Sequence, residues 1–119
     1  MAILYQMLLN RGVYGNVTYI KPETVDLFTA KQSTVSRRGL GFDRWDPDTA
    51  RHYPSKLASP QAFGHTGFTG TCVWVDPKYN LVYVFLSNRV NPNVSGKLSA
   101  LNIRPRIQDV VYSAIQKGL

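Results

Sequence analysis

The sequence predicts an α+β fold in which an antiparallel sheet of about three strands is flanked by helices. The clearest strand is Leu81–Ser87, LVYVFLS, a nearly continuous run of aliphatic and aromatic residues. A second strand, TCVWV over Thr71–Val75, precedes it, and the residues DPKYN between them are enough for a hairpin turn. Apolar residues at helical spacing mark both ends of the chain. Consecutive strands, with helices kept apart from them, indicate this fold class.

Three segments predict helices. The first is Ala2–Asn10, where apolar residues are spaced as on one helix face and Gly12 follows as a stop signal. The second is KPETVDLFTAK, residues 21–31, in which Pro22 suits the first helical position. The third is RPRIQDVVYSAIQKG, residues 104–118, which carries an apolar face. The C-terminal helix is expected to pack on the sheet.

The third strand of the predicted sheet lies near residues 38–44, in RRGLGFD, where its glycines indicate a bulge or a close backbone approach. Residues 46–62 contain three prolines and many polar groups and are expected to form a long loop. VYGNVTYI, residues 13–20, predicts a short extended link with a turn at Gly15-Asn16. Because Leu81–Ser87 is apolar at almost every position, it is expected to be buried on both faces.

Length and composition limit the chain to one globular domain and exclude several functions. The 119 residues carry a formal charge of +7, but the 14 Lys and Arg residues are scattered singly or in pairs, which argues against nucleic acid as a partner. No apolar run approaches the roughly 20 residues of a membrane span. The single cysteine, Cys72, and two widely separated histidines offer no internal disulfide and no metal cluster, so no metal or other cofactor is expected.

The stretch FGHTGFTG, Phe63–Gly70, is the candidate for chemistry. His65 offers a titratable ring, Thr66 a hydroxyl, and Gly67 lets another group approach the backbone. The spacing alone leaves two interpretations open, a glycine-rich connection before a core strand and a polar recognition edge. The chain contains neither Gly-x-Ser-x-Gly nor Ser-x-x-Lys, so a complete catalytic set is not expected in these residues alone.

A long ordered match favours the recognition edge. Residues 64–92, GHTGFTGTCVWVDPKYNLVYVFLSNRVNP, resemble the third-motif region of serine β-lactamases and penicillin-binding-protein-like enzymes, and class C β-lactamases with related esterases and D-aminopeptidases above all. In that family Lys-Thr-Gly or His-Thr-Gly lies on a strand that lines the active site. Residues 4–29 are similar to the helix-turn-helix ahead of that strand, and RRGLGFD and IRPRIQDVVYSAI to further family segments. The resemblance implies a partial β-lactamase/transpeptidase-like fold.

The resemblance also implies roles for four residues. His65 and Thr66 would face the substrate, with Thr66 near its carboxylate or carbonyl side. The backbone N–H of Phe68 would be one donor of the oxyanion hole, and its partner donor would be the N–H of the nucleophilic serine. Gly67 would keep this edge open to the substrate.

Two motifs of the family have no counterpart in these residues. Ser-x-x-Lys is absent, and the letters Tyr-Gly-Asn at Tyr14–Asn16 fall between the first two helices, away from the place of the second motif, Tyr-x-Asn or Ser-x-Asn. The resemblance therefore implies that residues 1–119 are the C-terminal fragment of a bacterial serine hydrolase domain and that the chain alone is inactive. The parent would act on a β-lactam, a D-amino-acid peptide of the peptidoglycan type or an ester.

The family is usually exported or periplasmic. Because the apolar start MAILYQMLL lacks a basic region and a cleavage site, the chain as expressed is expected to stay in the cytoplasm.

A different interpretation is a standalone, non-catalytic binding or assembly module that kept the sheet and lost the chemistry. The two interpretations differ in the surface that a missing lobe would cover. A fragment would expose apolar residues there and would tend to self-associate, whereas a module would have a polar surface. The apolar start of the chain favours the fragment.

Overall fold

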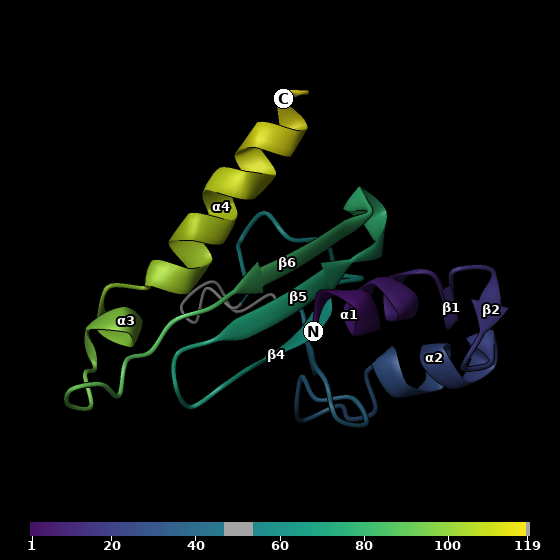
Figure 1. The fold of residues 1–119 in the computed structure, drawn as a ribbon, viewed down its shortest axis with the longest axis horizontal. Helices are drawn as coiled ribbons and strands as arrows, with labels where there is room; N and C mark the ends of the chain where they lie inside the picture. The colour runs from purple at the N-terminus through teal and green to yellow at the C-terminus, as the bar shows by residue number, and fades with distance from the viewer. Residues whose placement is uncertain (47–53, 119) are drawn as a thin grey trace.

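The structure is a computed structural model that describes residues 1–46 and 54–118. It contains two sheets and four α-helices within these residues (Figure 1). The elements in chain order are α1 (Ala2–Leu9), β1 (Val13–Tyr14), β2 (Val17–Thr18), α2 (Pro22–Thr29), β3 (Asp43–Arg44), β4 (Phe63–Thr66), β5 (Cys72–Asp76), a 3₁₀ turn (Pro77–Tyr79), β6 (Leu81–Phe85), α3 (Lys97–Ala100) and α4 (Ile103–Gln116). The α+β class with an antiparallel sheet is confirmed.

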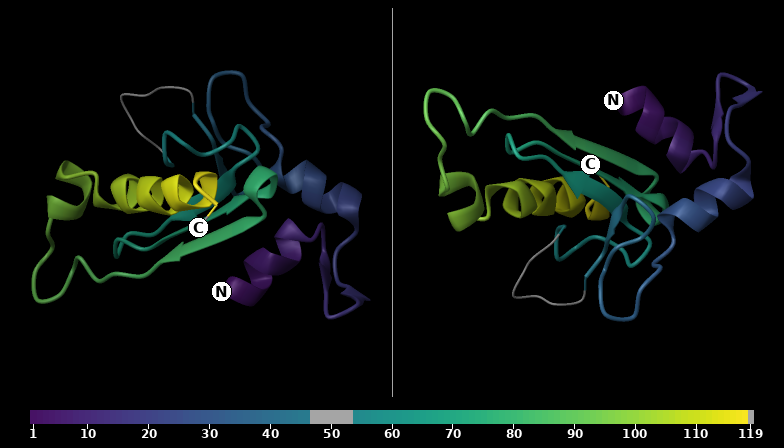
Figure 2. Two further views of the ribbon diagram at one scale, coloured as in Figure 1. Left: turned by 90° about the horizontal axis from the view of Figure 1, so that it is seen from above. Right: turned by 90° about the horizontal axis from the view of Figure 1, so that it is seen from below.

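The main sheet has the order β3-β4-β5-β6 and is antiparallel throughout. Its central strand β5 is buried at all five positions, and successive side chains alternate between two helical layers. Val75 packs with Met7 of α1 and Val25 of α2, whereas Trp74 packs on the α4 side, near Val111. Figure 2 shows α1 and α4 on opposite faces of this sheet. The protein is therefore three layers thick, with its strands in the middle.

The sequence located α1, α2, α4 and the β5–β6 hairpin well, whereas the short helix α3 lies in a segment that was expected to be a loop. Pro22 is the first residue of α2, and DPKYN forms the tight connection between β5 and β6, where Asn80 takes a left-handed conformation. The predicted link over 13–20 is a two-stranded hairpin. Its turn residues Gly15 and Asn16 both have positive φ, which matches the right-handed twist of the strands.

The sheet of about three strands has a fourth, because Phe63–Thr66 pairs with β5 over its whole length. Two expectations about the bounds and burial of the other strands were wrong. Residues 38–44 are a tight hairpin in which only Asp43–Arg44 joins the sheet and Arg38 bridges back to Asp43. Leu81–Ser87 is not buried on both faces: β6 ends at Phe85 and only Tyr83 is buried, because β6 lies at the edge of the sheet. Within the predicted loop, residues 54–62 are irregular and 47–53 lie outside the described residues.

A buried carboxylate joins β5 to the segments around it. Asp76 is fully buried and accepts hydrogen bonds from the Ser59 N–H (2.8 Å), the Ser59 hydroxyl (2.5 Å), the Tyr112 hydroxyl of α4 (2.7 Å) and the Lys78 N–H (3.2 Å). Four donors offset the cost of removing this group from water. Asp76 thereby fixes α4 and the segment before β4 to the end of β5.

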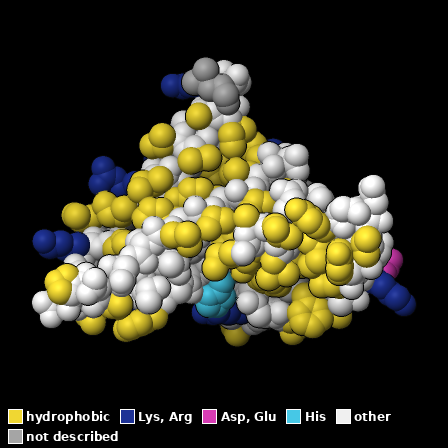
Figure 3. Space-filling view, in the orientation of Figure 1, with side chains coloured by type: hydrophobic (Ala, Val, Ile, Leu, Met, Phe, Trp, Pro, Cys, Tyr) yellow, Lys and Arg dark blue, Asp and Glu magenta, His cyan; other side chains and the backbone are white. Residues whose placement is uncertain are grey.

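Apolar side chains remain exposed over part of the surface. Ile3 and Leu4 of α1 are 60% and 53% exposed, and Phe28 of α2 is 45% exposed. Figure 3 shows hydrophobic side chains gathered over α1 and along α4 on one face of the molecule. Among the described residues, no helix has the length and apolar character needed to cross a membrane.

We expect the Asp76–Tyr112 bond to give the chain a distinct alkaline stability profile. Burial and the bond to Asp76 raise the pKa of Tyr112 above its ordinary value of 10.0. The unfolded chain then loses this proton near pH 10 while the folded chain keeps it, so the free energy of unfolding should fall as the pH rises above 10. Tyr112→Phe should cost about 1.5–3 kcal/mol at neutral pH and make this fall shallower.

Urea unfolding from pH 7 to 11 measures both effects. Tyr19→Phe, a change at a 64% exposed tyrosine, is the control and should keep the wild-type profile. An unchanged alkaline slope in Tyr112→Phe would contradict this account.

Candidate functional site

The candidate site is the second half of β4, where the strand has an open edge. All four residues of β4 pair with β5, but β3 reaches only Phe63 and Gly64. The outer edge at His65 and Thr66 therefore has no strand partner among the described residues. Both side chains are half-buried, and the two residues that follow are exposed. An extended ligand could pair with this edge as an added strand.

Glycine at position 64 is what brings β4 close to β5. A Cβ atom there would meet the Val73 carbonyl oxygen and lie 2.8 Å from the Trp74 ring. The Trp74 side chain, which is only 2% exposed, fills the space that a side chain at 64 would take. His65, the next residue, falls on the opposite face and lies beside Val73 across the strands.

The two nitrogens of the His65 ring have different partners. Nε2 lies 2.8 Å from Nη1 of Arg38, and Nδ1 lies 2.7 Å from the backbone oxygen of Thr66. Arg38 comes from the hairpin before β3 and also contacts Asp43, with its Nε 2.9 Å from Oδ1. Asp43 is only 1% exposed. The ring is therefore held between its own strand and a charged pair from the neighbouring hairpin.

The turn from β4 to β5 is held by Arg89. Its Nε donates to the Phe68 carbonyl oxygen at 2.6 Å, its guanidinium lies 4.7 Å from the centre of the Phe68 ring, and its backbone N–H donates to Thr69. Within the turn, the Gly67 N–H donates to Thr71 at 2.8 Å and the Gly70 N–H to Gly67 at 3.0 Å. This clamp fixes the direction of the backbone directly after the His-Thr-Gly motif.

The Phe68 N–H is left available by this turn. It donates no hydrogen bond to any residue in the described part of the chain, and neither does the Thr66 hydroxyl. Phe68 as a residue is 73% exposed. An N–H without an acceptor, a neighbouring hydroxyl and an open strand edge together suit a carbonyl oxygen or an oxyanion.

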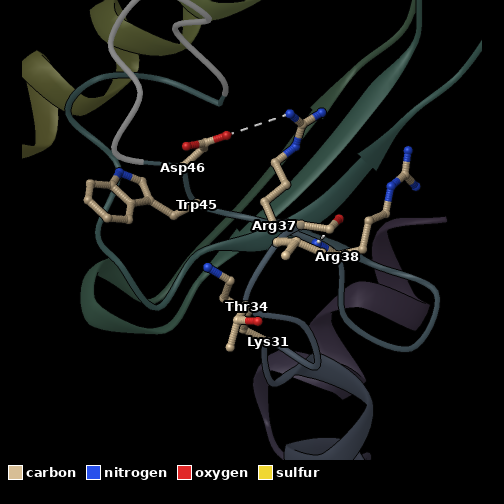
Figure 4. Close-up of a pocket in the computed structure, with 8 residues that line it drawn as sticks. Lys31, Thr34, Arg37, Arg38, Trp45 and Asp46 are labelled. Atoms are coloured by element: carbon tan, nitrogen blue, oxygen red, sulfur yellow. Dashed lines mark hydrogen bonds and ion pairs between the residues drawn. The ribbon is translucent and has the colours of Figure 1, made fainter.

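A polar cavity of about 320 Å³ is lined in part by Arg37 and Arg38. Figure 4 shows Arg37 and Asp46 facing each other there, with 3.7 Å between the guanidinium and the carboxylate, and Arg38 extending away from that pair. Lys31 and Trp45 also line this cavity. With three cationic side chains and one carboxylate in its lining, the cavity has a net positive character.

Cys72 is not available as a nucleophile. Burial raises the pKa of its thiol to about 11, although the nearby Arg104 acts in the opposite direction. The thiol is therefore protonated and shielded at neutral pH, and it packs with Trp74 and Tyr83. No group of three or more histidine, cysteine or acidic side chains that could hold a metal ion comes together within residues 1–46 and 54–118.

The model of the family described as Beta-lactamase matches residues 9–106, which is most of the chain. The chain belongs to the beta-lactamase family.

The curated relatives are much longer than this chain. The N-acetylmuramyl-L-alanine amidase of Bacillus subtilis is 40% identical over 103 residues, which cover 79% of this chain and 23% of that protein. A protein of Salmonella paratyphi B with the provisional name D-alanyl-D-alanine carboxypeptidase is 38% identical over 127 aligned positions, which cover 98% of this chain and 29% of that protein. The chain thus spans less than a third of the length of these relatives.

A solved structure has the same fold. A beta-lactamase of Mycobacterium bovis superposes with a TM-score of 0.70 over 94% of this chain and 42% of its own, at 24% identity. The α+β arrangement therefore corresponds to part of a beta-lactamase fold.

The structure places His65 and Thr66 at the end of β4, and Gly67 and Phe68 at the start of the turn that follows. Sequence reasoning missed Arg38, Asp43 and Arg89, the three side chains that hold this edge in place. Arg38 is 27 positions from His65 and Arg89 is 21 from Phe68, so local patterns carry no signal for these contacts. The tight hairpin indicated by Gly39 and Gly41 was the available hint for Arg38.

The two glycines of the motif region should respond differently to a methyl group. Gly64→Ala should cost at least about 1–3 kcal/mol, because the new atom would overlap a backbone oxygen that cannot move alone. Gly67→Ala should cost less, because its nearest neighbour is the Thr71 hydroxyl, which can rotate away. Chemical denaturation of both variants tests the difference. Equal losses in the free energy of unfolding would show that the close approach of β4 to β5 does not determine the cost of Gly64→Ala.

Proposed function

We propose that this chain forms the substrate-facing strand of a serine acyl-transfer enzyme that acts on peptidoglycan-type peptides. In this proposal the open edge of β4 aligns an extended substrate, and the Thr66 hydroxyl binds its carboxylate or carbonyl side. The Phe68 N–H stabilises the negative charge that develops on the carbonyl oxygen when a serine attacks. Gly67 keeps the edge free of side-chain atoms. The observation that carries the proposal is the unengaged Phe68 N–H beside the unpaired edge at His65 and Thr66.

The names of the relatives support this substrate class. Both the amidase of Bacillus subtilis and the carboxypeptidase of Salmonella paratyphi B are named for bonds to alanine residues. A strand edge that reads backbone groups suits peptides of this kind, because main-chain hydrogen bonds provide the alignment. A β-lactam or a simple ester would present a carbonyl to the same two donors, so both remain suitable probes.

The nucleophile of the proposed reaction lies outside these 119 residues. The chain contains no Ser-x-x-Lys, and its length is less than a third of that of its relatives. In the full reaction a serine Oγ attacks the carbonyl carbon, the amine leaves, and water later releases the acyl group. This chain would supply binding and charge stabilisation for these steps. It is in this sense the C-terminal fragment of a β-lactamase-like serine hydrolase domain.

The non-catalytic module remains the alternative. It is favoured by the absence of the nucleophile motif, whereas the exposed apolar residues Ile3, Leu4 and Phe28 favour the fragment. Activity of the longer protein that carries this segment decides between them.

The chain alone should not hydrolyse a chromogenic β-lactam or a p-nitrophenyl ester above background. Positioned donors without a nucleophile give only about 10³–10⁴ over the uncatalysed rate in a complete subtilisin-type site. Here the second donor of the oxyanion hole is also missing, so even this residual should vanish. The measurement is burst-phase acylation with a fluorescent penicillin, followed by mass spectrometry. A labelled serine in these 119 residues would overturn the proposal.

In the full-length protein, Thr66→Val and His65→Ala should each lower kcat/KM for a D-alanyl-D-alanine peptide. The loss expected for Thr66→Val is about ten- to a hundredfold, the range for a hydrogen bond to a charged group. Neither residue is in the apolar core, so the melting temperature should change little. Thr69→Val, a change at an exposed threonine of the same turn, is the matched control and should retain activity. Full activity of the Thr66 variant would count against the assigned role.

A further inference from the structure

Arg38 reaches the candidate site because of how its hairpin folds. The Gly39 N–H donates to the Phe42 oxygen at 2.9 Å and Gly41 has a φ of +100°, so the chain reverses tightly. This reversal places Arg38 opposite Asp43, and Asp43 in turn is paired with Gly64 of β4. The residue that follows Gly64 is His65. These two backbone pairings, Arg38 with Asp43 and Asp43 with Gly64, bring Arg38 to the open edge of β4.

The guanidinium of Arg38 binds two partners at once. Nε lies 2.9 Å from the Asp43 carboxylate and Nη1 lies 2.8 Å from Nε2 of His65. The Asp43 side chain is only 2% exposed, and Arg37 lies 3.7 Å from its other oxygen. This ion pair joins a guanidinium whose side chain is 53% exposed to a carboxylate that is buried.

The chemistry of the guanidinium determines the state of the His65 ring. Arginine stays charged and only donates hydrogen bonds, so Nε2 of His65 must accept, which leaves the ring without a proton on that nitrogen. The proton of the ring then lies on Nδ1, which donates to the Thr66 oxygen at 2.7 Å. In this arrangement the imidazole is neutral, and the positive charge beside the motif belongs to Arg38.

We propose that Arg38 is the positioning residue of His65: it holds the ring as the neutral Nδ1–H tautomer and supplies the positive charge at this edge. Only the effect of Arg38 on catalysis rests on the proposed function. The state of the ring itself can be measured without any activity. His65 in turn binds the backbone oxygen of Thr66, so the orientation of the ring and that of the motif are coupled.

The experiment is long-range ¹H–¹⁵N NMR on the 119-residue chain labelled at histidine. The sequence has two histidines, and His52→Gln assigns the signals. At neutral pH the wild-type His65 should show a proton-bearing Nδ1 and a pyridine-type Nε2. In Arg38→Gln the ring should lose this single tautomer, whereas Arg38→Lys, which keeps a charged donor, should retain more of it. A wild-type ring protonated on Nε2, or an unchanged ring in Arg38→Gln, would overturn the proposal.

The control removes one arginine charge elsewhere. Arg11 pairs with the exposed Asp26 at 2.5 Å and does not touch His65, so Arg11→Gln should leave the His65 signals unchanged. If it shifted them to the same extent as Arg38→Gln, net charge rather than contact would be responsible, and the proposal would fail. Should Arg38→Gln not fold, the wild-type tautomer and the Arg38→Lys spectrum still decide the question.

Activity of the full-length protein separates this inference from the proposed function. If the tautomer of His65 changes in the Arg38 variants as expected but the protein hydrolyses none of the peptide, ester and β-lactam probes, the proposed function fails and the positioning role stands. If the protein is active and loses activity in His65→Ala, Arg38→Gln should lower kcat and Arg38→Lys should restore part of it. An Arg38→Gln enzyme with unchanged kcat would contradict the catalytic consequence.

Discussion

The buried carboxylate of Asp76 is the interaction on which the arrangement of the layers depends. It lies at the end of the central strand and collects donors from α4, from the segment before β4 and from the turn after β5. Without it, the Tyr112 hydroxyl and both Ser59 donors would be left without an acceptor in the core, at a cost of about 1–3 kcal/mol each. Through Ser59, this group also joins the segment before β4 to the end of β5.

The parts of the fold that follow local rules could be predicted from the sequence. Pro22 at the first position of α2, the Gly15-Asn16 turn and the apolar runs of β5 and β6 each act over a few residues. Strand β4 could not be predicted in this way, because Gly64 is a poor strand former and the segment has no alternation of apolar and polar residues. Its pairing with β5 overrides that propensity: Gly64 gives Trp74 room, and backbone bonds hold the rest.

The candidate site also has a part that could be predicted from the sequence and a part that could not. Its four motif residues are contiguous, so they can be recognised in the sequence, and the family resemblance implies their roles. The residues that orient them are distant in sequence: Arg38 acts on the His65 ring, Asp43 holds Arg38, and Arg89 holds the Phe68 carbonyl. In the sequence these arginines count only toward the net charge. The hairpin geometry and the register of β3 on β4 are what bring Arg38 to His65.

The edge position of β6 has a consequence for the behaviour of the chain in solution. Its five residues, LVYVF, contain no charge or proline, and no second strand pairs with its outer side in the part of the chain that the structure describes. Such an edge is a template for strand addition between molecules. The charge of +7 opposes that approach by mutual repulsion, and repulsion is screened within about 10 Å at 0.1 M salt. The colloidal stability of the chain therefore depends on ionic strength. At low salt the positive charge keeps molecules apart, and at higher salt the edge of β6 is free to pair with another molecule.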